Sequence, residues 1–213
     1  MKKSIFALAL GVLLSVGLMA QQGDYRPGLF FREDWTEEPK YSDIPAAQKH
    51  VSNLDLLMSS YGPGKDSLTK SHHEKPLDDP YYIWSGRALG NWMVSLKHRS
   101  MNVDLSSYAK IKWRTKQAGF RVLRITLKLA DGTWLVSDVG DDASADWRIR
   151  EFNISDIKWY TLDMGRLSEL RLVESPDLSN VEEIGFTDLM RGGMSASCSR
   201  LDWIEVYGEP VER

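Results

Sequence analysis

Strict alternation of apolar and polar side chains is the feature that most constrains how this chain can fold. From residue 123 to residue 129, leucine and isoleucine side chains alternate with Arg124, Thr126 and Lys128. A period of two places the aliphatic groups on one face of a strand, whereas a helix would need a period near 3.6. Residues 130–133 contain Asp131 and Gly132 and supply a turn, and residues 134–137 return as a hairpin partner. The sequence therefore predicts β-structure here.

Similar short runs, separated by turn residues, continue almost to the C-terminus. Together with an earlier run at Leu29–Trp35 they suggest about nine or ten strands. This pattern predicts an all-β protein, a single β-sandwich or jelly roll of mainly antiparallel strands, with residues 81–208 as the main sandwich. The further runs are Tyr82–Ser85, Trp92–Lys97, Lys110–Lys116, Trp147–Ile154, Ile157–Leu162, Glu169–Val173, Glu183–Thr187 and Leu201–Gly208.

Residues 21–80 lack this regularity. Prolines and glycines interrupt each apolar run, for example at Glu37-Glu38-Pro39 and at Gly62-Pro63-Gly64. We expect long ordered loops around a first strand at Leu29–Trp35, with a short helix at Val51–Ser59 as an alternative. No repeat or low-complexity linker divides the sequence, so residues 21–213 are expected to form one domain.

The first 20 residues have the layout of a cleavable secretory signal. Lys2 and Lys3 precede an apolar run from Ile5 to Met19, and Ala20 stands before a polar segment. We expect cleavage after Ala20 and export to the periplasm or the extracellular space. Removing the two lysines lowers the 27 basic side chains to 25, against 30 acidic ones. This balance gives no reason to expect a nucleic-acid partner, and the short apolar run gives none to expect stable membrane insertion.

Several segments follow one another in an order found in one large group of β-sandwiches. They are Asp104–Tyr108 leading into Ile111–Thr115, the hairpin Leu127–Gly132, Val181–Phe186 and the closing Arg200–Gly208. Over roughly residues 103–208 this order resembles the galactose-binding-like β-sandwiches, which include many carbohydrate-binding modules of secreted bacterial proteins. The resemblance implies a sandwich fold and recognition of a carbohydrate. Because one sandwich hosts many activities, it bears more on fold than on function.

The resemblance also implies a metal ion. In such modules an acidic residue near the first strand and one in the closing strand often share a structural calcium ion, and Glu33 or Asp34 and Asp202 stand in similar places. Calcium takes about six to eight oxygen ligands, so backbone carbonyls or a further carboxylate would have to join them. The other interpretation of these residues is that Asp202 caps a loop and that Glu33 is solvated.

Eight tryptophans are many for this chain length, and a sugar ring can stack its apolar C–H face on a flat indole. Most are expected in the core, among them Trp113, which is in phase with the apolar residues of its strand. Trp203 and Tyr207 are out of phase with Ile204 and Val206, so we expect them on the opposite, outward face. These two rings are candidate contacts for a ligand.

A second group of candidate ligand-binding residues surrounds the loop from Ser85 to Asn91. Gly86 and Gly90 would let the backbone of this loop approach a ligand, beside the loop that contains Gly192-Gly193. The side chains expected to contribute are Tyr82, Trp84, Arg87, Asn91 and Trp92.

Groupings of catalytic residue types are sparse. His72, His73 and Asp79 could approach one metal ion from a loop, but adjacent histidines in an extended segment point in opposite directions. Hydrolysis of a glycosidic bond needs two carboxylates at a fixed separation, which a sequence does not show. The carboxylates available are Asp138, Asp141, Asp142, Asp146 and Glu151, of which Asp141 and Asp142 have the setting of simple turn residues.

Basic residues also alternate along two of the predicted strands. Lys110, Lys112 and Arg114 share one phase, and Arg124 and Lys128 share one phase of the other strand. If the two strands are neighbours, their outward faces would form a cluster able to bind uronates or sulfates. The interpretation we favour is that such alternation only keeps an exposed sheet soluble.

The sequence thus predicts a secreted, non-catalytic protein that binds a glycan or polysaccharide. Two other hypotheses stay open. One is a glycoside hydrolase or polysaccharide lyase on a concanavalin-like or related β-sandwich, with its site in the loops of residues 71–92. The other is an envelope protein that binds another protein. A shallow aromatic surface would favour carbohydrate binding, whereas convergent carboxylates or a histidine–carboxylate cluster in a cleft would favour an enzyme.

Overall fold

The computed structural model describes residues 26–38, 40, 45–87, 89–194 and 196–213. These residues contain fifteen β-strands, no α-helix, and short 3-10 helices at Gln48–His50, Lys65–Ser67 and Ile154–Asp156. The expected signal and its cleavage site lie outside the described residues. In the described part of the chain, no helix has the length and apolarity that crossing a membrane requires.

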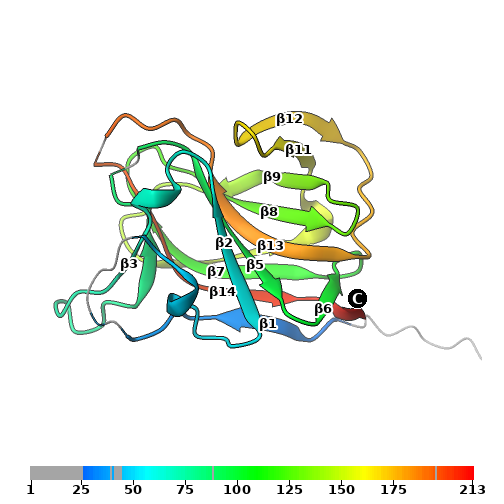
Figure 1. Cartoon of the computed structure of the whole chain (residues 1–213), viewed down its shortest axis with the longest axis horizontal. Helices are drawn as coiled ribbons and strands as arrows, with labels where there is room; N and C mark the ends of the chain where they lie inside the picture. The colour runs from blue at the N-terminus through cyan, green and yellow to red at the C-terminus, as the bar shows by residue number, and fades with distance from the viewer. Residues whose placement is uncertain (1–25, 39, 41–44, 88, 195) are drawn as a thin grey trace, which may run out of the picture.

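The strands form two antiparallel sheets that make a sandwich (Figure 1). The smaller sheet has six strands in the order β10-β7-β14-β4-β3, and β1 also pairs with β14. These strands are β1 (Leu29–Glu33), β3 (Thr69–Ser71), β4 (Tyr82–Trp84), β7 (Lys110–Gln117), β10 (Arg148–Asn153) and β14 (Ser199–Tyr207).

The larger sheet has nine strands. Its main order is β12-β11-β9-β8-β13-β5-β2, and β6 pairs with both β13 and β15. These strands are β2 (Leu56–Tyr61), β5 (Trp92–His98), β6 (Met101–Asp104), β8 (Leu123–Leu129), β9 (Trp134–Asp141), β11 (Trp159–Asp163), β12 (Ser168–Val173), β13 (Val181–Asp188) and β15 (Glu209–Glu212). The all-β sandwich predicted from the sequence is therefore confirmed.

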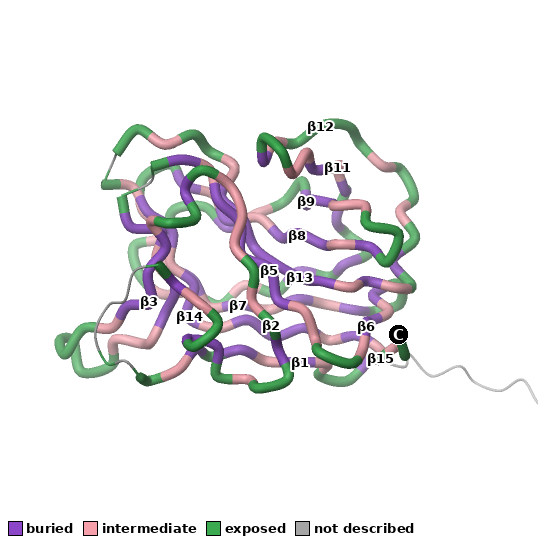
Figure 2. The backbone as a smooth tube through the Cα atoms, in the orientation of Figure 1, coloured by how far each residue is buried: buried purple, intermediate pink, exposed green. Residues whose placement is uncertain are grey.

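Alternation decides which side chains enter the space between the sheets. In β7, Ile111 and Trp113 are fully buried, whereas the basic residues between and beside them are half-buried on the outer face. In β8, Ile125 and Leu127 are buried in the same core. Figure 2 shows buried residues in purple along the strands and exposed residues in green in the connecting loops. Removal of these apolar groups from water is the main source of stability for the sandwich.

A second apolar cluster lies apart from the main core. Met93, Val136, Leu162 and Leu167 are buried in it. Because Met93 belongs to this cluster and its neighbour Trp92 to the main core, β5 is buried on both faces. The regular alternation of a half-buried strand is therefore lost in β5.

Each run predicted from Tyr82 onwards coincides with a strand, with bounds that differ by a few residues. Two expectations for residues 21–80 are wrong. Leu56–Tyr61 is strand β2, paired along its whole length with β5, so no helix occupies Val51–Ser59. Thr69–Ser71 is strand β3, so this part of the chain contributes to both sheets and is not limited to loops and one strand. Strands β6 and β15 were also not predicted.

Candidate functional site

The candidate site is the outer face of the six-stranded sheet. Trp203 and Tyr207 of β14 are half-buried there, whereas Ile204 and Val206 between them are fully buried. This burial pattern agrees with the outward placement of the two rings that alternation predicts.

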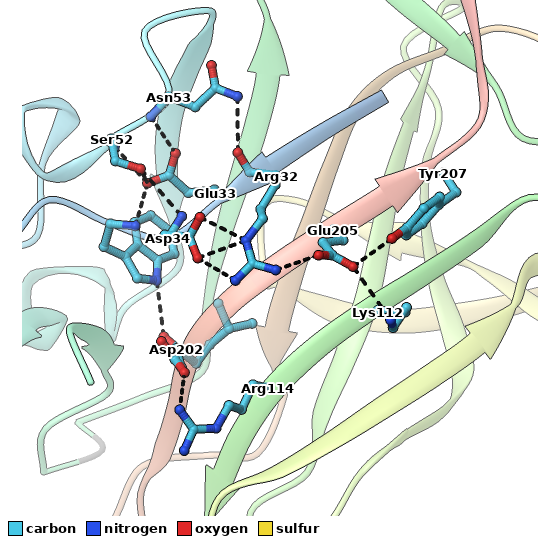
Figure 3. A network of polar contacts seen from close by, with 12 residues as sticks. Arg32, Glu33, Asp34, Ser52, Asn53, Lys112, Arg114, Asp202, Glu205 and Tyr207 are labelled. Atoms are coloured by element: carbon cyan, nitrogen blue, oxygen red, sulfur yellow. Dashed lines mark hydrogen bonds and ion pairs between the residues drawn. The ribbon is translucent and has the colours of Figure 1, made fainter. Parts of the chain in front are cut away.

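Arg32 of β1 is the centre of a charged network on this face (Figure 3). Its guanidinium carbon lies 4.4 Å from the centre of the Trp203 ring. Its Nε and Nη2 donate to Asp34 at 2.8 and 2.6 Å, and its Nη1 donates to Glu205. The hydrogen bond to Asp34 raises the pKa of Arg32 most, burial lowers it, and the hydrogen bond to Glu205 raises it further. Trp203 is thus covered by a guanidinium that two carboxylates hold in place.

Glu205 connects this guanidinium to the neighbouring residues. Its Oε2 accepts a hydrogen bond from the Tyr207 hydroxyl at 2.9 Å and lies 3.7 Å from Nζ of Lys112 on β7 (Figure 3). Burial opposes ionisation of Glu205, but the hydrogen bonds from Tyr207 and Arg32 outweigh it and lower the pKa of this carboxyl. Glu205 is therefore an anion that orients the Tyr207 ring.

Asp202 is the carboxyl of this face whose pKa is shifted most strongly. Its side chain accepts a hydrogen bond from Nη1 of Arg114 at 2.7 Å, and the residue is only 6% exposed. Burial raises the pKa of Asp202 to about 6, even though Arg114 favours the charged form. Asp202 therefore titrates close to neutral pH.

Four half-buried aromatic rings of this region each have a cation over them. Arg32 lies over Trp203, as described, and Lys110 lies over Tyr207 at 5.0 Å. Such contacts fix the orientation of a ring and leave hydrogen-bond donors at its edge. The other pairs are Arg114 over Trp147 at 5.4 Å and Arg200 over Trp84 at 6.0 Å. We call Trp84, Trp147, Trp203 and Tyr207 the aromatic face; from Arg200 to Tyr207 it extends roughly 20 Å along β14.

Two hollows meet at one end of the aromatic face. Lys116 of β7 and Arg200 of β14 are paired across the sheet there, and both line both hollows. One hollow, of about 180 Å³, is also lined by His73, Asp79, Tyr82 and Trp147. The other, of about 480 Å³, is also lined by residues 117–119 and 143–145. We call the two together the Lys116–Arg200 cleft.

A third hollow, of about 540 Å³, lies at the opposite end of the aromatic face. Tyr207 and Lys110 line it together with Tyr108 and Glu151. The aromatic face is therefore bordered at both ends by space that a ligand could enter.

The structure separates the residues predicted around the 85–91 loop. Tyr82 and Trp84 lie on β4, next to Arg200, and belong to the candidate site. Trp92 is 2% exposed and packs edge-on against Phe186 in the core, so its predicted contact with a ligand is wrong. Its indole is a core side chain.

Asn91 and Arg87 do not contact the rings of the aromatic face in the described structure. Asn91 donates through Nδ2 to the backbone oxygen of Arg166 at 2.9 Å and to that of Leu167. This amide therefore ties together two loops of the protein. Arg87 is exposed on the loop itself.

Gly86 of this loop and Gly192 of the neighbouring loop are explained by packing within the protein. A Cβ on Gly86, whose φ is +61°, would lie 2.8 Å from the carbonyl oxygen of Ser67. A Cβ on Gly192 would lie 2.2 Å from the carbonyl oxygen of Leu89. The 85–91 loop does lie beside the Gly192-Gly193 loop, as predicted, but the two backbones approach each other rather than a ligand.

Glu33, proposed above as a metal ligand, binds backbone amides instead. It is fully buried, and its Oε1 accepts hydrogen bonds from the amides of Trp35 and Ser52, both at 2.7 Å (Figure 3). Its Oε2 accepts from the amide of Asn53 at 3.0 Å. Burial raises the pKa of Glu33, and these amides act in the opposite direction. Oxygens that face N–H donors do not present free lone pairs to a cation.

The other two expected calcium ligands are also engaged, because Asp34 binds Arg32 and Asp202 binds Arg114. Within the described residues, no three His, Cys, Asp or Glu side chains gather in a way that could hold a metal ion. Glu33, Asp34 and Asp202 therefore do not fit a calcium site in this arrangement. Calcium binding at these carboxylates would require them to change partners.

His72 and His73 contact different atoms of Asp79. His73 Nδ1 lies 3.0 Å from Asp79 Oδ2 and 3.1 Å from the Tyr82 hydroxyl. His72 Nδ1 lies 3.0 Å from the backbone oxygen of Asp79, and its ring stacks on Tyr81 with 4.2 Å between centroids. The two imidazoles do not converge on one position for a metal ion.

The carboxylates considered for glycoside hydrolysis are each bound by a cation or an amide. Asp141 is fully buried and shares Arg148 with Asp142. The remaining contacts are those of Asp138 with the amide of Lys158 at 2.9 Å, Asp146 with Lys116 at 3.6 Å, and Glu151 with Lys110 at 3.2 Å.

The basic residues of the two strands do not form one cluster. Strand β7 lies in the six-stranded sheet and β8 in the nine-stranded sheet, so the condition for a shared basic surface is not met. The cations are also paired individually: Arg124 binds Glu169, and Lys128 binds Glu182 and Glu183.

Four residues of the candidate site were not identified from the sequence: Arg32, Trp147, Lys116 and Arg200. The one sequence signal that could have indicated Lys116 is the basic alternation of β7, which continues to this residue.

No family model matches the sequence. No curated protein matches it either. Among solved structures, a family 11 carbohydrate-binding module of a cellulosomal cellulase of Clostridium thermocellum is 16% identical, with 76% of this chain and 92% of the module covered and a TM-score of 0.46. A family 30 carbohydrate-binding module of another cellulosomal cellulase of that organism is 14% identical, with 79% and 98% covered and a TM-score of 0.46.

The carbohydrate recognition domain of Emp47p is 11% identical, with 80% of this chain and 96% of that domain covered and a TM-score of 0.40. Carbohydrate-binding modules, the class named by the sequence resemblance, thus occur among the solved structures that this chain resembles. With TM-scores under 0.5 and identities of 11–16%, these similarities carry no conclusion about the side chains of a site.

Proposed function

We propose that the protein binds carbohydrate through the aromatic face without changing the ligand chemically. The observation that carries this proposal is the set of four half-buried rings on one sheet face, each with a cation over it and with hollows at both ends. A sugar ring offers apolar C–H groups, which can pack against the parts of the rings that the cations leave exposed, and hydroxyl groups around its rim. Donors such as Arg32 and acceptors such as Glu205 stand next to the rings and can meet those hydroxyls.

The energetics predict modest affinity for one sugar unit. Each ring replaces only a small apolar area, and every hydroxyl exchanges water for a protein partner. A chain of sugars that contacts several rings along roughly 20 Å would bind more tightly, because one molecule then gains several contacts for a single loss of translational freedom. A polysaccharide is therefore the expected ligand.

We also propose that the protein acts outside the cytoplasm. The support is the N-terminal sequence, in which Lys2 and Lys3 precede an apolar run of signal length. Mass spectrometry of the protein from the envelope and medium of the producing cell should find an N-terminus near Gln21. Intact protein with Met1 in the cytosol would contradict export.

Affinity electrophoresis in gels that contain individual soluble polysaccharides tests the binding proposal. Retardation of the wild-type protein should be reduced by Trp203→Ala and by Trp84→Ala. Trp134→Ala is the matched control, because Trp134 is also half-buried but packs against the second apolar cluster. Circular dichroism should show that the variants are folded. Folded Trp203→Ala and Trp84→Ala variants that bind like the wild type would contradict the proposal.

A second candidate function is polysaccharide cleavage by a lyase. The observation that favours it is the Tyr82–His73–Asp79 contact in the same hollow as Lys116 and Arg200. A tyrosine hydroxyl is protonated at neutral pH and can donate a proton; burial raises the pKa of Tyr82 further, and the imidazole of His73 lies 3.1 Å from this hydroxyl. Elimination next to a uronate carboxylate would release unsaturated sugar ends, whose ultraviolet absorbance is a direct assay. Absence of this signal with ligands that bind would contradict lyase activity.

A further inference from the structure

Most cations on the outer face of the six-stranded sheet are neutralised by carboxylates. Lys110 binds Glu151 at 3.2 Å, and Arg114 binds Asp202 at 2.7 Å. Lys112 lies 3.7 Å from Glu205, which also accepts a hydrogen bond from Arg32. These cations orient rings and carboxylates within the protein. They are therefore not free to bind an anion from outside.

Arg200 and Lys116 differ from these cations. Arg200 makes no ion pair with any described residue; its guanidinium faces neutral groups, the Trp84 ring and the Tyr82 hydroxyl. Among the described residues, Lys116 pairs only with Asp146, at 3.6 Å, and the Asp146 side chain is 86% exposed. An ion pair this exposed contributes little and exchanges easily with a competing anion. Two cations that are neighbours across β7 and β14 thus lack firm internal partners.

The surroundings of this pair favour an anionic ligand. Lys75 also lines the smaller hollow, and the carboxylate that lines it, Asp79, already accepts a hydrogen bond from the backbone amide of His73, whose imidazole Nδ1 lies 3.0 Å from the same oxygen. The hollow therefore carries more positive than negative charge, which attracts anions into it. A guanidinium binds carboxylate or sulfate oxygens through two parallel hydrogen bonds.

Aromatic rings stand directly beside these cations. Trp147 lines the smaller hollow with Lys116 and Arg200, and its ring packs edge-on against Tyr82 at 5.2 Å. Trp84 lies under Arg200. An acidic sugar carries an apolar C–H face and an anionic group on one ring, so a single sugar unit could contact Trp147 and reach both cations.

We propose that Lys116 and Arg200 form an anion subsite that binds the carboxylate or sulfate group of an acidic polysaccharide at one end of the aromatic face. This inference rests on the proposed carbohydrate-binding function and specifies the ligand class. Lys110 and Arg114 orient the rings beneath them, Lys112 is paired with Glu205, and the Lys116–Arg200 cleft provides selectivity for charge.

Binding to polygalacturonate and to its methyl ester compares the same backbone with and without the charge. The wild-type protein should bind polygalacturonate more tightly, and binding should weaken as salt is added, because salt screens exposed charges. The double variant Lys116→Gln/Arg200→Gln should bind polygalacturonate about tenfold more weakly or worse. Lys158→Gln is the control, because this lysine is exposed and lies at the nine-stranded sheet, near β11.

A sulfated galactan provides a second arm, which shows whether the subsite accepts a sulfate instead of a carboxylate. A neutral mixed-linked β-glucan provides a third arm, on which the double variant should match the wild type. The anion subsite would be overturned if the wild-type protein bound both galacturonan forms with equal affinity and if Trp203→Ala, but not the double variant, weakened this binding. Carbohydrate binding through the aromatic face would then remain supported. A folded wild-type protein that binds none of these polysaccharides would overturn both proposals.

Discussion

The guanidinium of Arg32 lies over the indole of Trp203 and, from the same position, binds Glu205, which is two residues further along β14 than Trp203. One cation on β1 therefore fixes both an aromatic ring and a carboxylate on the adjacent strand. Because Glu205 in turn accepts a hydrogen bond from Tyr207, the two outward rings of β14 belong to one connected network. The orientation of the rings thus depends on charged residues that are partly accessible to solvent.

Removing this cation should change binding more than stability. Arg32→Ala is expected to lower the free energy of unfolding by about 1 kcal/mol or less, because the side chain is 35% exposed and its ion pairs are screened. Its effect on polysaccharide affinity should be larger, since Trp203 and Glu205 lose their common partner. A double-mutant cycle with Glu205→Gln, measured by denaturant unfolding and by affinity electrophoresis, tests this coupling. Additive effects of the two substitutions on affinity would contradict it.

Glu33→Gln should destabilise the protein strongly. The carboxylate is fully buried and accepts hydrogen bonds from three backbone amides, and a Gln side chain replaces one acceptor oxygen by an NH2 group that faces a donor. We expect a loss of about 2–3 kcal/mol in the free energy of unfolding. Glu38→Gln, at an exposed position, is the control and should change it little. Equal, small effects of the two substitutions in urea denaturation would contradict the role assigned to Glu33.

Stability should depend on pH through Asp202. Its folded-state pKa of about 6 lies above its ordinary value of 3.8, so the folded protein binds the proton more tightly than the unfolded chain does. This carboxyl therefore stabilises the fold fully below pH 3.8, and the contribution is lost as the pH rises through 6. Asp202→Asn lacks this titration. From pH 4 to pH 7, the melting temperature of the variant should therefore rise relative to that of the wild type. A difference in melting temperature that does not change with pH would contradict the raised pKa.

Calcium can be tested on the same variants. Because Glu33 binds amides and Asp202 binds Arg114, the present arrangement predicts that thermal melts with calcium and with a chelator coincide. A higher melting temperature with calcium that both Glu33→Gln and Asp202→Asn abolish would show instead that these carboxylates change partners to bind the ion.

Local sequence patterns predicted most of the strands from Tyr82 onwards. The period-two alternation of β7 correctly separates buried Trp113 from its half-buried basic neighbours. In β8 it correctly places Ile125 in the core, although the polar neighbour Thr126 is buried as well. β2 was missed because Leu56, Leu57 and Met58 are residues that favour helices. Its strand conformation comes from pairing with β5, which a local pattern does not contain.

The site was predictable only in part, for the same reason. Trp203 and Tyr207 could be placed outward from their own strand. Trp92 could not be placed correctly, because the second apolar cluster buries the other face of β5 and removes its alternation. The partners of Arg200 and Glu33 depend on which strands and loops become neighbours, and this information is not local in the sequence.

The most direct test of carbohydrate binding through the aromatic face is an NMR titration that follows the eight tryptophan indole N–H signals, assigned by single Trp→Phe substitutions. Oligosaccharides of the polysaccharide that binds best should shift the signals of Trp84, Trp147 and Trp203. The signals of Trp113 and Trp159, which are buried in the core, should stay in place. Shifts confined to Trp134, or no shift at any indole while binding is saturated, would contradict the assignment of the site to this face.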